Sequence, residues 1–353
     1  MNLRHPIAAL LGIVAVLAAG CGVTGPHSDH TITVYSAGGL GDWYRSQFDT
    51  FTKETGIGVE LFEAGSGELV SRVNSGAVWE GLDKDGSPPP ADLLVTLPPF
   101  IQKAAKAGLL QPGGADTTGI SPAAVGPEGL YVPIVKTALC FISNPGVDPA
   151  PVVWSDFLRP EFKGKLQYST PGEAGDGTAM LLLLQHQMGR QEALDYLARL
   201  QANNAGPASS TSGLQAKVNS GELWVANGDV QMNLSSINND GSTFDIFFPA
   251  MPDKPRTTIG VSYVAGVTAG SRWPDESKKL LAFLLSDEVQ RSVYTEAFGT
   301  PVRDSIAAEG SRDSGAMTPI GLLKDVELWE PDWNSVLDDL EGDVAAYQQA
   351  IRR

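Results

Sequence analysis

The sequence is poor in the residues that most catalytic and metal-binding sites require. It contains two cysteines and four histidines among 353 residues. It also lacks a Gly-x-Ser-x-Gly segment and a Gly-x-x-x-x-Gly-Lys-Ser/Thr loop, which are typical of serine hydrolases and of phosphoryl-transfer enzymes. Three histidines fall within the first 30 residues, so no metal-ligand spacing is visible. We therefore expect no enzymatic activity, no metal and no other cofactor.

Basic residues are also scarce. There are 25 Lys and Arg against 41 Asp and Glu, a net charge of −16. This field repels nucleic acid and anionic membrane surfaces, so nucleic acid is excluded as a partner. The same field attracts cations, and it suits a solute that carries both charges better than a pure anion. The length and a hydrophobic content of 42% are enough for two folded lobes.

The N-terminus has the order of a secretion signal. Arg4 precedes an apolar run over 7–19, which is shorter than the roughly 20 residues that cross a bilayer. The segment 17–21, Leu-Ala-Ala-Gly-Cys, resembles a bacterial lipobox. That resemblance implies a signal peptide over 1–20, a lipid on Cys21 and a tether over 21–30, with the protein anchored at the outer face of the cytoplasmic membrane or in the periplasm. The mature chain then has a net charge of −17.

The second cysteine, Cys140, lies in the apolar run 138–142. An apolar run of this kind is typical of a buried strand, so we interpret Cys140 as a core residue and not as a nucleophile. With Cys21 acylated, no disulfide can form.

Predicted strands and helices alternate in the first part of the mature chain. Apolar and β-branched patterns predict strands over 31–35, 57–62 and 91–96. Helices are predicted over 42–55, 66–73 and 98–108. This alternation favours a mostly parallel sheet, with ligand-binding loops at the carboxyl ends of the strands.

Two long apolar segments, 131–144 and 257–267, predict strands that cross between two lobes. Between them we expect strands over 164–168, 223–226 and 243–249 and helices over 154–158, 177–188, 192–201 and 212–220. After the second crossing, helices are predicted over 274–285, 287–297 and 333–351. The predicted fold class is thus α/β with two lobes joined by hinge crossings, with residues 31–135 and 265–353 in lobe 1 and residues 136–264 in lobe 2.

Several short segments carry a family resemblance over residues 31 to about 304. They include Val34-Tyr35-Ser36-Ala37, Gly65-Ser66-Gly67-Glu68, Gly175-Asp176-Gly177-Thr178-Ala179 and Asn227-Gly228-Asp229-Val230-Gln231. The chain resembles the 2-aminoethylphosphonate-binding branch of the solute-binding lipoproteins of ABC importers, which lies near the ferric-ion binders. The resemblance implies the periplasmic-binding-protein type II fold. It also implies a monomer that delivers an aminophosphonate to an ABC permease and its ATPase. A polyamine, thiamine, phosphate or a ferric ion is the alternative solute.

Three glycine-rich helix starts are candidates for holding a phosphonate, because the first N–H groups of a helix are free to bind anions. Their candidate residues are Ser36 and Ala37, then Ser66 and Gly67, then Asp176, Gly177 and Thr178. Small residues let the ligand approach the backbone, and the hydroxyls add donors. The alternative interpretation is that these segments are ordinary helix caps.

Other candidates complete the predicted site. Asp229 is the first candidate for binding the ammonium group, with Tyr263 as a wall, although an Asp beside Gly228 can also simply form a turn. Thr96 lies at the end of a predicted strand and could complete the cleft. The resemblance to the ferric-ion binders adds Asn204 as an anion contact. Those relatives bind iron through two adjacent tyrosines, which this sequence does not contain.

Overall fold

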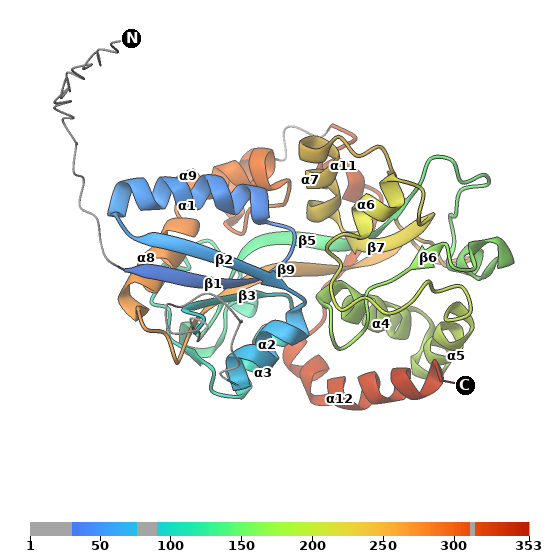
Figure 1. Ribbon diagram of the computed structural model, residues 1–353, viewed down its shortest axis with the longest axis horizontal. Helices are drawn as coiled ribbons and strands as arrows, with labels where there is room; N and C mark the ends of the chain where they lie inside the picture. The colour runs from blue at the N-terminus through green and yellow to red at the C-terminus, as the bar shows by residue number, and fades with distance from the viewer. Residues whose placement is uncertain (1–29, 76–89, 311–314, 353) are drawn as a thin grey trace, which may run out of the picture.

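The computed structural model describes residues 30–75, 90–310 and 315–352. The predicted signal peptide, Cys21 and nearly all of the predicted tether lie outside these residues. The described chain forms two lobes that share two long strands (Figure 1). The sheet order is β2-β1-β3-β9-β5-β7-β6, so the two ends of this path belong to different lobes.

The first lobe is built on three parallel strands, β1 (Thr31–Ala37), β2 (Gly58–Ala64) and β3 (Leu93–Thr96). Helix α1 (Gly41–Thr55) lies on one side of these strands, and α2 (Ser66–Ser75) and α3 (Phe100–Lys106) lie on the other (Figure 1). Two further helices, α8 (Pro274–Leu284) and α9 (Asp287–Ser292), return to this lobe. As predicted, β1, β2 and β3 each lead into a loop and a helix.

The second lobe contains β6 (Leu166–Gln167), β7 (Val225–Asp229) and β8 (Asp245–Phe247). Its helices are α4 (Gly175–Met188), α5 (Arg190–Leu200), α6 (Leu214–Asn219) and α7 (Val230–Asp240). The apolar run of α4 is buried, as its composition predicts for a helix in a lobe core. Helix α7 was not predicted, and its absence from the prediction affects the interpretation of Asp229 below.

Two crossing strands connect the lobes. Strand β5 (Val132–Ser143) pairs with β9 (Thr257–Thr268) in its first part and with β7 and β8 in its last part. Strand β9 also pairs with β3. All of these pairs are antiparallel. The parallel pairing predicted for the first part of the chain is confirmed for β1, β2 and β3, but the sheet as a whole is mixed. The reason is that each crossing strand returns against its neighbours instead of following a βαβ connection. Cys140 is buried on β5, as predicted.

The C-terminal segment touches both lobes. Helix α11 (Pro319–Leu323) packs on α7, and β10 (Glu327–Trp329) pairs with the start of β9. Helix α12 (Trp333–Ala350) runs beneath both lobes, from α3 to α5 (Figure 1). Its Tyr347 hydroxyl lies 3.2 Å from that of Tyr168 in the second lobe, and its Asp338 accepts a 2.8 Å bond from Lys106 in the first. Residues 265–353 therefore do not all pack within one lobe.

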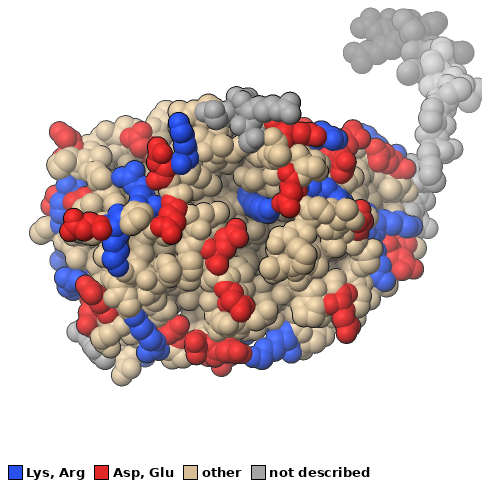
Figure 2. All heavy atoms as spheres, turned by 180° about the vertical axis from the view of Figure 1, so that it is seen from behind, with Lys and Arg blue, Asp and Glu red and all other residues tan. Residues whose placement is uncertain are grey.

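The molecular surface carries both signs of charge. On the face seen in Figure 2, Lys and Arg are interspersed with Asp and Glu and form no single-sign patch. Among the residues that the structure describes, none of the helices combines the length and apolar character needed to cross a bilayer.

Candidate functional site

A narrow cavity lies where the two lobes meet. The first lobe contributes the loop after β1 with Ala37 and Gly38, and the start of α2 with Ser66. The second lobe contributes the start of α4 with Asp176, and the loop before α6 with Thr211. The cavity measures about 20 Å³, which admits little more than one water molecule. A solute can therefore enter only when the lobes separate.

Glycines allow the lobes to approach this closely. A Cβ on Gly65 would lie 2.0 Å from the carbonyl oxygen of Ser209 in the opposite lobe. A Cβ on Gly38 would lie 2.0 Å from the Ser212 Oγ, and the amide of Gly67 donates a 2.8 Å bond to the Glu173 carbonyl. These contacts bring backbone N–H groups of α2 and α4 to the same small space.

Two side chains form hydrogen bonds between the lobes beside the cavity. Gln231, on α7, donates from Nε2 to the carbonyl of Gly39 at 2.9 Å and to that of Ala297 at 2.7 Å. The hydroxyl of Tyr263, on the crossing strand β9, lies 3.0 Å from the carbonyl oxygen of Gly38. Both contacts fix the loop after β1 against residues of the second lobe and the crossing.

Asp176 is the buried acid of the cavity wall. It lies in the first turn of α4, and 3% of it is exposed. Its Oδ1 has no hydrogen-bond partner within the part of the chain that the structure describes. Burial and, secondarily, the nearby Asp229 carboxyl raise the pKa of Asp176 to about 8, and the Thr211 hydrogen bond opposes this rise. None of the described residues that line this cavity is Lys, Arg or His, so this lining supplies no cation to the Asp176 carboxyl.

Asp229 is also buried, but its oxygens have partners. It is the last residue of β7 and the N-cap of α7, where its Oδ1 accepts a 2.9 Å bond from the amide of Met232. The Thr137 hydroxyl donates to the same oxygen at 2.9 Å, and the Tyr263 hydroxyl lies 2.9 Å from Oδ2. Burial raises the pKa of Asp229, and these hydrogen bonds oppose the rise.

The Tyr263 hydroxyl has one proton and two oxygen neighbours, Gly38 O and Asp229 Oδ2. This hydroxyl therefore lies between the loop after β1 and the carboxyl at the start of α7. Asp229 and Tyr263 thus form part of the connection between lobes.

The structure brings some of the predicted site residues together. Ala37, Ser66 and Asp176 line the cavity. Ser36 lies behind its wall, and its hydroxyl donates to the Ala37 carbonyl at 2.9 Å. Thr96 ends β3 next to the lining residue Leu97, fully buried, and its Oγ1 has no partner among the described residues.

Other predicted residues have structural contacts instead. The Thr178 hydroxyl donates to the Ala174 carbonyl at 2.8 Å and accepts from the Gly172 amide at 2.9 Å. A Cβ on Gly177 would overlap the Ser169 carbonyl, so this glycine lets the start of α4 pack on the segment that follows β6. Asn204 bonds to Gln201 and to the Gly206 amide and does not line the cavity.

The sequence analysis did not include the loop at 208–213 or Met232, although both contribute to the cavity wall. The loop reads Ala-Ser-Ser-Thr-Ser-Gly, and such a run of small hydroxyl residues before a helix was a usable signal for a polar ligand contact. Met232 had no comparable signal, because its position depends on α7.

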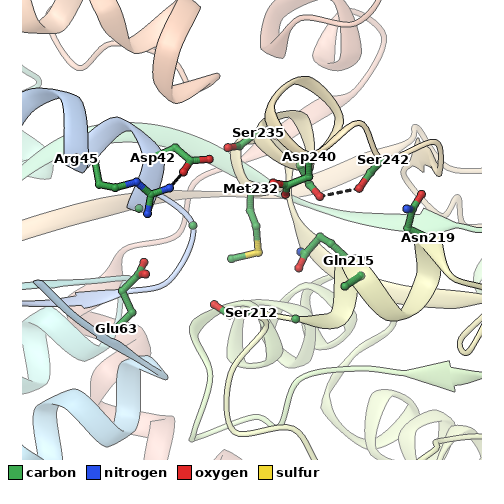
Figure 3. Close-up of a pocket in the computed structure, with 15 residues that line it drawn as sticks. Asp42, Arg45, Glu63, Ser212, Gln215, Asn219, Met232, Ser235, Asp240 and Ser242 are labelled. Atoms are coloured by element: carbon green, nitrogen blue, oxygen red, sulfur yellow. Dashed lines mark hydrogen bonds and ion pairs between the residues drawn. The ribbon is translucent and has the colours of Figure 1, made fainter. Parts of the chain in front are cut away.

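A wider bowl lies outside the cavity (Figure 3). It has a volume of about 480 Å³. Arg45 and Glu63 lie on one side and Gln215 and Asp240 on the other, with Met232 projecting between them. Met232 lines both the bowl and the inner cavity, so its side chain separates the two spaces.

No three His, Cys, Asp or Glu side chains gather at a metal-binding distance anywhere in the described residues. His186 lies exposed on α4 and stacks on Trp329 with ring centroids 4.0 Å apart, away from the cavity.

Comparisons with known proteins agree with this architecture. Residues 32–294 match the family model for bacterial extracellular solute-binding proteins. A Salmonella typhimurium protein named "Putative 2-aminoethylphosphonate-binding periplasmic protein" is 41% identical over 347 residues, which cover 97% of each chain. The solved periplasmic binding protein P5PA has a TM-score of 0.73 at 19% identity, over 92% of this chain and 100% of that chain. A periplasmic thiamin binding protein has a TM-score of 0.72 at 17% identity, over 93% and 99%. These structures confirm the predicted type II fold.

Proposed function

This chain belongs to the bacterial extracellular solute-binding proteins, and on that premise we propose that it is an ABC importer's receptor for 2-aminoethylphosphonate or a close organophosphonate. The observation that carries the choice of ligand is the composition of the cavity wall. A buried carboxyl, Asp176, lies there among backbone and hydroxyl groups, and the described lining contains no basic side chain. The relatives named for 2-aminoethylphosphonate support the same choice.

Such a wall suits a zwitterion. A buried acid without a protein cation favours a ligand that brings its own positive charge. A phosphonate can be held without Lys or Arg by N–H groups at helix starts, as at Ser66 on α2, and by hydroxyls of the loop before α6, such as that of Ser210. Inorganic phosphate offers an anion for the N–H and hydroxyl groups but no positive charge for Asp176. A polyamine offers the positive charge but no anion.

Ligand capture requires the lobes to open and close. Strand β5 pairs with β7 and β8 of the second lobe, β9 pairs with β3 of the first lobe, and β5 and β9 pair with each other, so we place the hinge in these two strands. Closure then brings the starts of α2 and α4 onto the ligand from opposite sides. The closed receptor is the form that a permease would receive.

The test is calorimetric titration of the mature protein with 2-aminoethylphosphonate, phosphate, spermidine, thiamine and ferric citrate in parallel. We expect 2-aminoethylphosphonate to bind at least about tenfold more tightly than the others, a difference of about 1.4 kcal/mol. Tryptophan fluorescence should change only with the solute that closes the lobes. Tighter binding of any other solute would replace the proposed ligand and leave the receptor role intact.

We further propose that the protein is exported and held at the membrane by a lipid on Cys21, a residue outside the described chain. The relatives named as periplasmic proteins support export. Replacing Cys21→Ser should move the protein from the membrane fraction to the soluble fraction, with Cys140→Ser as the matched control. Retention of the Cys21→Ser protein at the membrane would contradict the anchor.

A further inference from the structure

We propose that Asp176 is the specificity-determining residue of the receptor and binds the ammonium group of the ligand through Oδ1. This inference rests on the proposed function, because it assumes an amine-bearing phosphonate. It assigns to Asp176 the role that the sequence suggested for Asp229.

The geometry separates the two aspartates. Asp229 has a backbone amide and two hydroxyls as neighbours, so no oxygen is left for a ligand without breaking a bond of the fold. Asp176 lines the cavity and is only 3% exposed. Its Oδ1 has no hydrogen-bond partner among the described residues. An unpaired buried carboxyl is costly unless a binding partner supplies the missing charge or donor.

The surroundings of Asp176 support an ammonium. The titratable groups that interact electrostatically with Asp176 come from three neighbouring elements: Asp229 at the end of β7, Tyr263 on β9 and Cys140 on β5. All three are neutral or negative, so an ammonium would be the one positive charge at this site.

The first arm of the test compares two ligands of equal size, 2-aminoethylphosphonate and n-propylphosphonate, in which a methyl group replaces the ammonium. Asp176→Asn keeps the shape of the side chain and removes its charge. We expect this variant to bind 2-aminoethylphosphonate at least about 30-fold more weakly than the unaltered protein. Its affinity for n-propylphosphonate should change by less than about threefold. Glu60→Gln, on the exposed edge of β2, removes the same charge away from the site and should leave both affinities unchanged.

The second arm uses the unaltered protein, so it does not depend on the folding of a variant. The ¹³C shift of the Asp176 carboxyl, read at pH 7, should be that of a protonated acid in the free protein, because burial raises its pKa. Addition of 2-aminoethylphosphonate should move the shift to that of a carboxylate.

Three outcomes decide the proposal. Loss of 2-aminoethylphosphonate binding alone in Asp176→Asn, with ionisation of the carboxyl on binding, supports it. Equal losses for both phosphonates, or a carboxyl that stays protonated in the complex, would overturn it while leaving the proposed function in place. If the unaltered protein binds neither phosphonate, the proposed function itself fails and this inference fails with it.

Discussion

Two helices of the second lobe, α4 and α7, have a buried aspartate at their start. The two aspartates differ in the hydrogen bonds that they make within the protein. Asp229 caps α7, and two hydroxyls contact it as well. Asp176 lies one residue inside α4, where Ala174 and not Asp176 is the cap residue. Its Oδ1 has no partner in the described chain. A buried carboxyl whose oxygens are hydrogen-bonded within the protein has a structural role. A buried carboxyl with an unpaired oxygen is available to a ligand.

The comparison extends to the hydroxyls. Thr178 and Thr96 are both fully buried threonines near the cavity. The hydroxyl of Thr178 makes two bonds within its own turn, whereas that of Thr96 has no partner among the described residues. Position near a helix start therefore does not distinguish a residue that contacts the ligand from one that supports the fold. The two are distinguished by how many hydrogen bonds the side chain already makes within the protein.

The largest effect should come from removing the structural aspartate. Asp229→Ala should lower the free energy of unfolding by about 2–4 kcal/mol, because it removes a helix cap, leaves the Thr137 hydroxyl without its acceptor and removes one of the two acceptors beside the Tyr263 hydroxyl. Asp176→Ala removes an unpaired buried acid, so its free energy of unfolding should stay within about 1 kcal/mol of the unaltered protein or rise. Urea unfolding of both variants measures the contrast. Equal destabilisation would remove the distinction between the two aspartates.

The pH dependence of stability should isolate Asp176. Its pKa is raised by burial to about 8 in the folded protein, from an ordinary 3.8. The folded state therefore keeps a proton that the unfolded chain releases, and stability falls as pH rises from about 4 to about 8. The loss is at most about 1.4 kcal/mol per pH unit. The free energy of unfolding of the Asp176→Asn variant should fall less steeply over this pH range. Urea unfolding at pH 5, 6, 7 and 8 tests this, and parallel curves for the two proteins would contradict it.

The sequence was sufficient to predict the lobes' main strands and the crossings, because their apolar patterns are long and local. It also proposed Ala37, Ser66 and Asp176 for one site, and in the structure Ala37 ends β1, Ser66 begins α2 and Asp176 lies in the first turn of α4. Helix α7 was missed because its Asn and Ser residues are weak helix formers. Its signals were Asp229 as N-cap and Gly241, with φ of 68°, as the terminating residue.

The remaining errors concern partners that are distant in sequence. Whether Asp229 has a free oxygen depends on Thr137 and Tyr263, which lie 92 and 34 residues away. The antiparallel return of β9 against β3 and β5 also follows from tertiary pairing. A local pattern contains no information about such partners.

A smaller effect is expected at Thr178. Thr178→Val removes the donor to the Ala174 carbonyl and the acceptor for the Gly172 amide, so the free energy of unfolding should fall by about 1–2 kcal/mol. Affinity for 2-aminoethylphosphonate should change less than about twofold, and Thr178→Ser, which keeps the hydroxyl, should restore stability. Urea unfolding and calorimetric titration separate the two effects. Lost affinity at unchanged stability would instead return Thr178 to the ligand site.

The smallest effect should appear where the inner cavity meets the bowl. Met232 is 7% exposed and contributes to the walls of both spaces, so its side chain limits how far a ligand can extend from the inner cavity. Met232→Ala should improve the affinity for 3-aminopropylphosphonate, relative to 2-aminoethylphosphonate, by about threefold, or roughly 0.7 kcal/mol. Met232→Leu preserves most of the volume and should leave the ratio unchanged. Calorimetric titration with both ligands gives the ratio. If Met232→Ala left it unaltered, ligand length would be set by the closed lobes and not by this side chain.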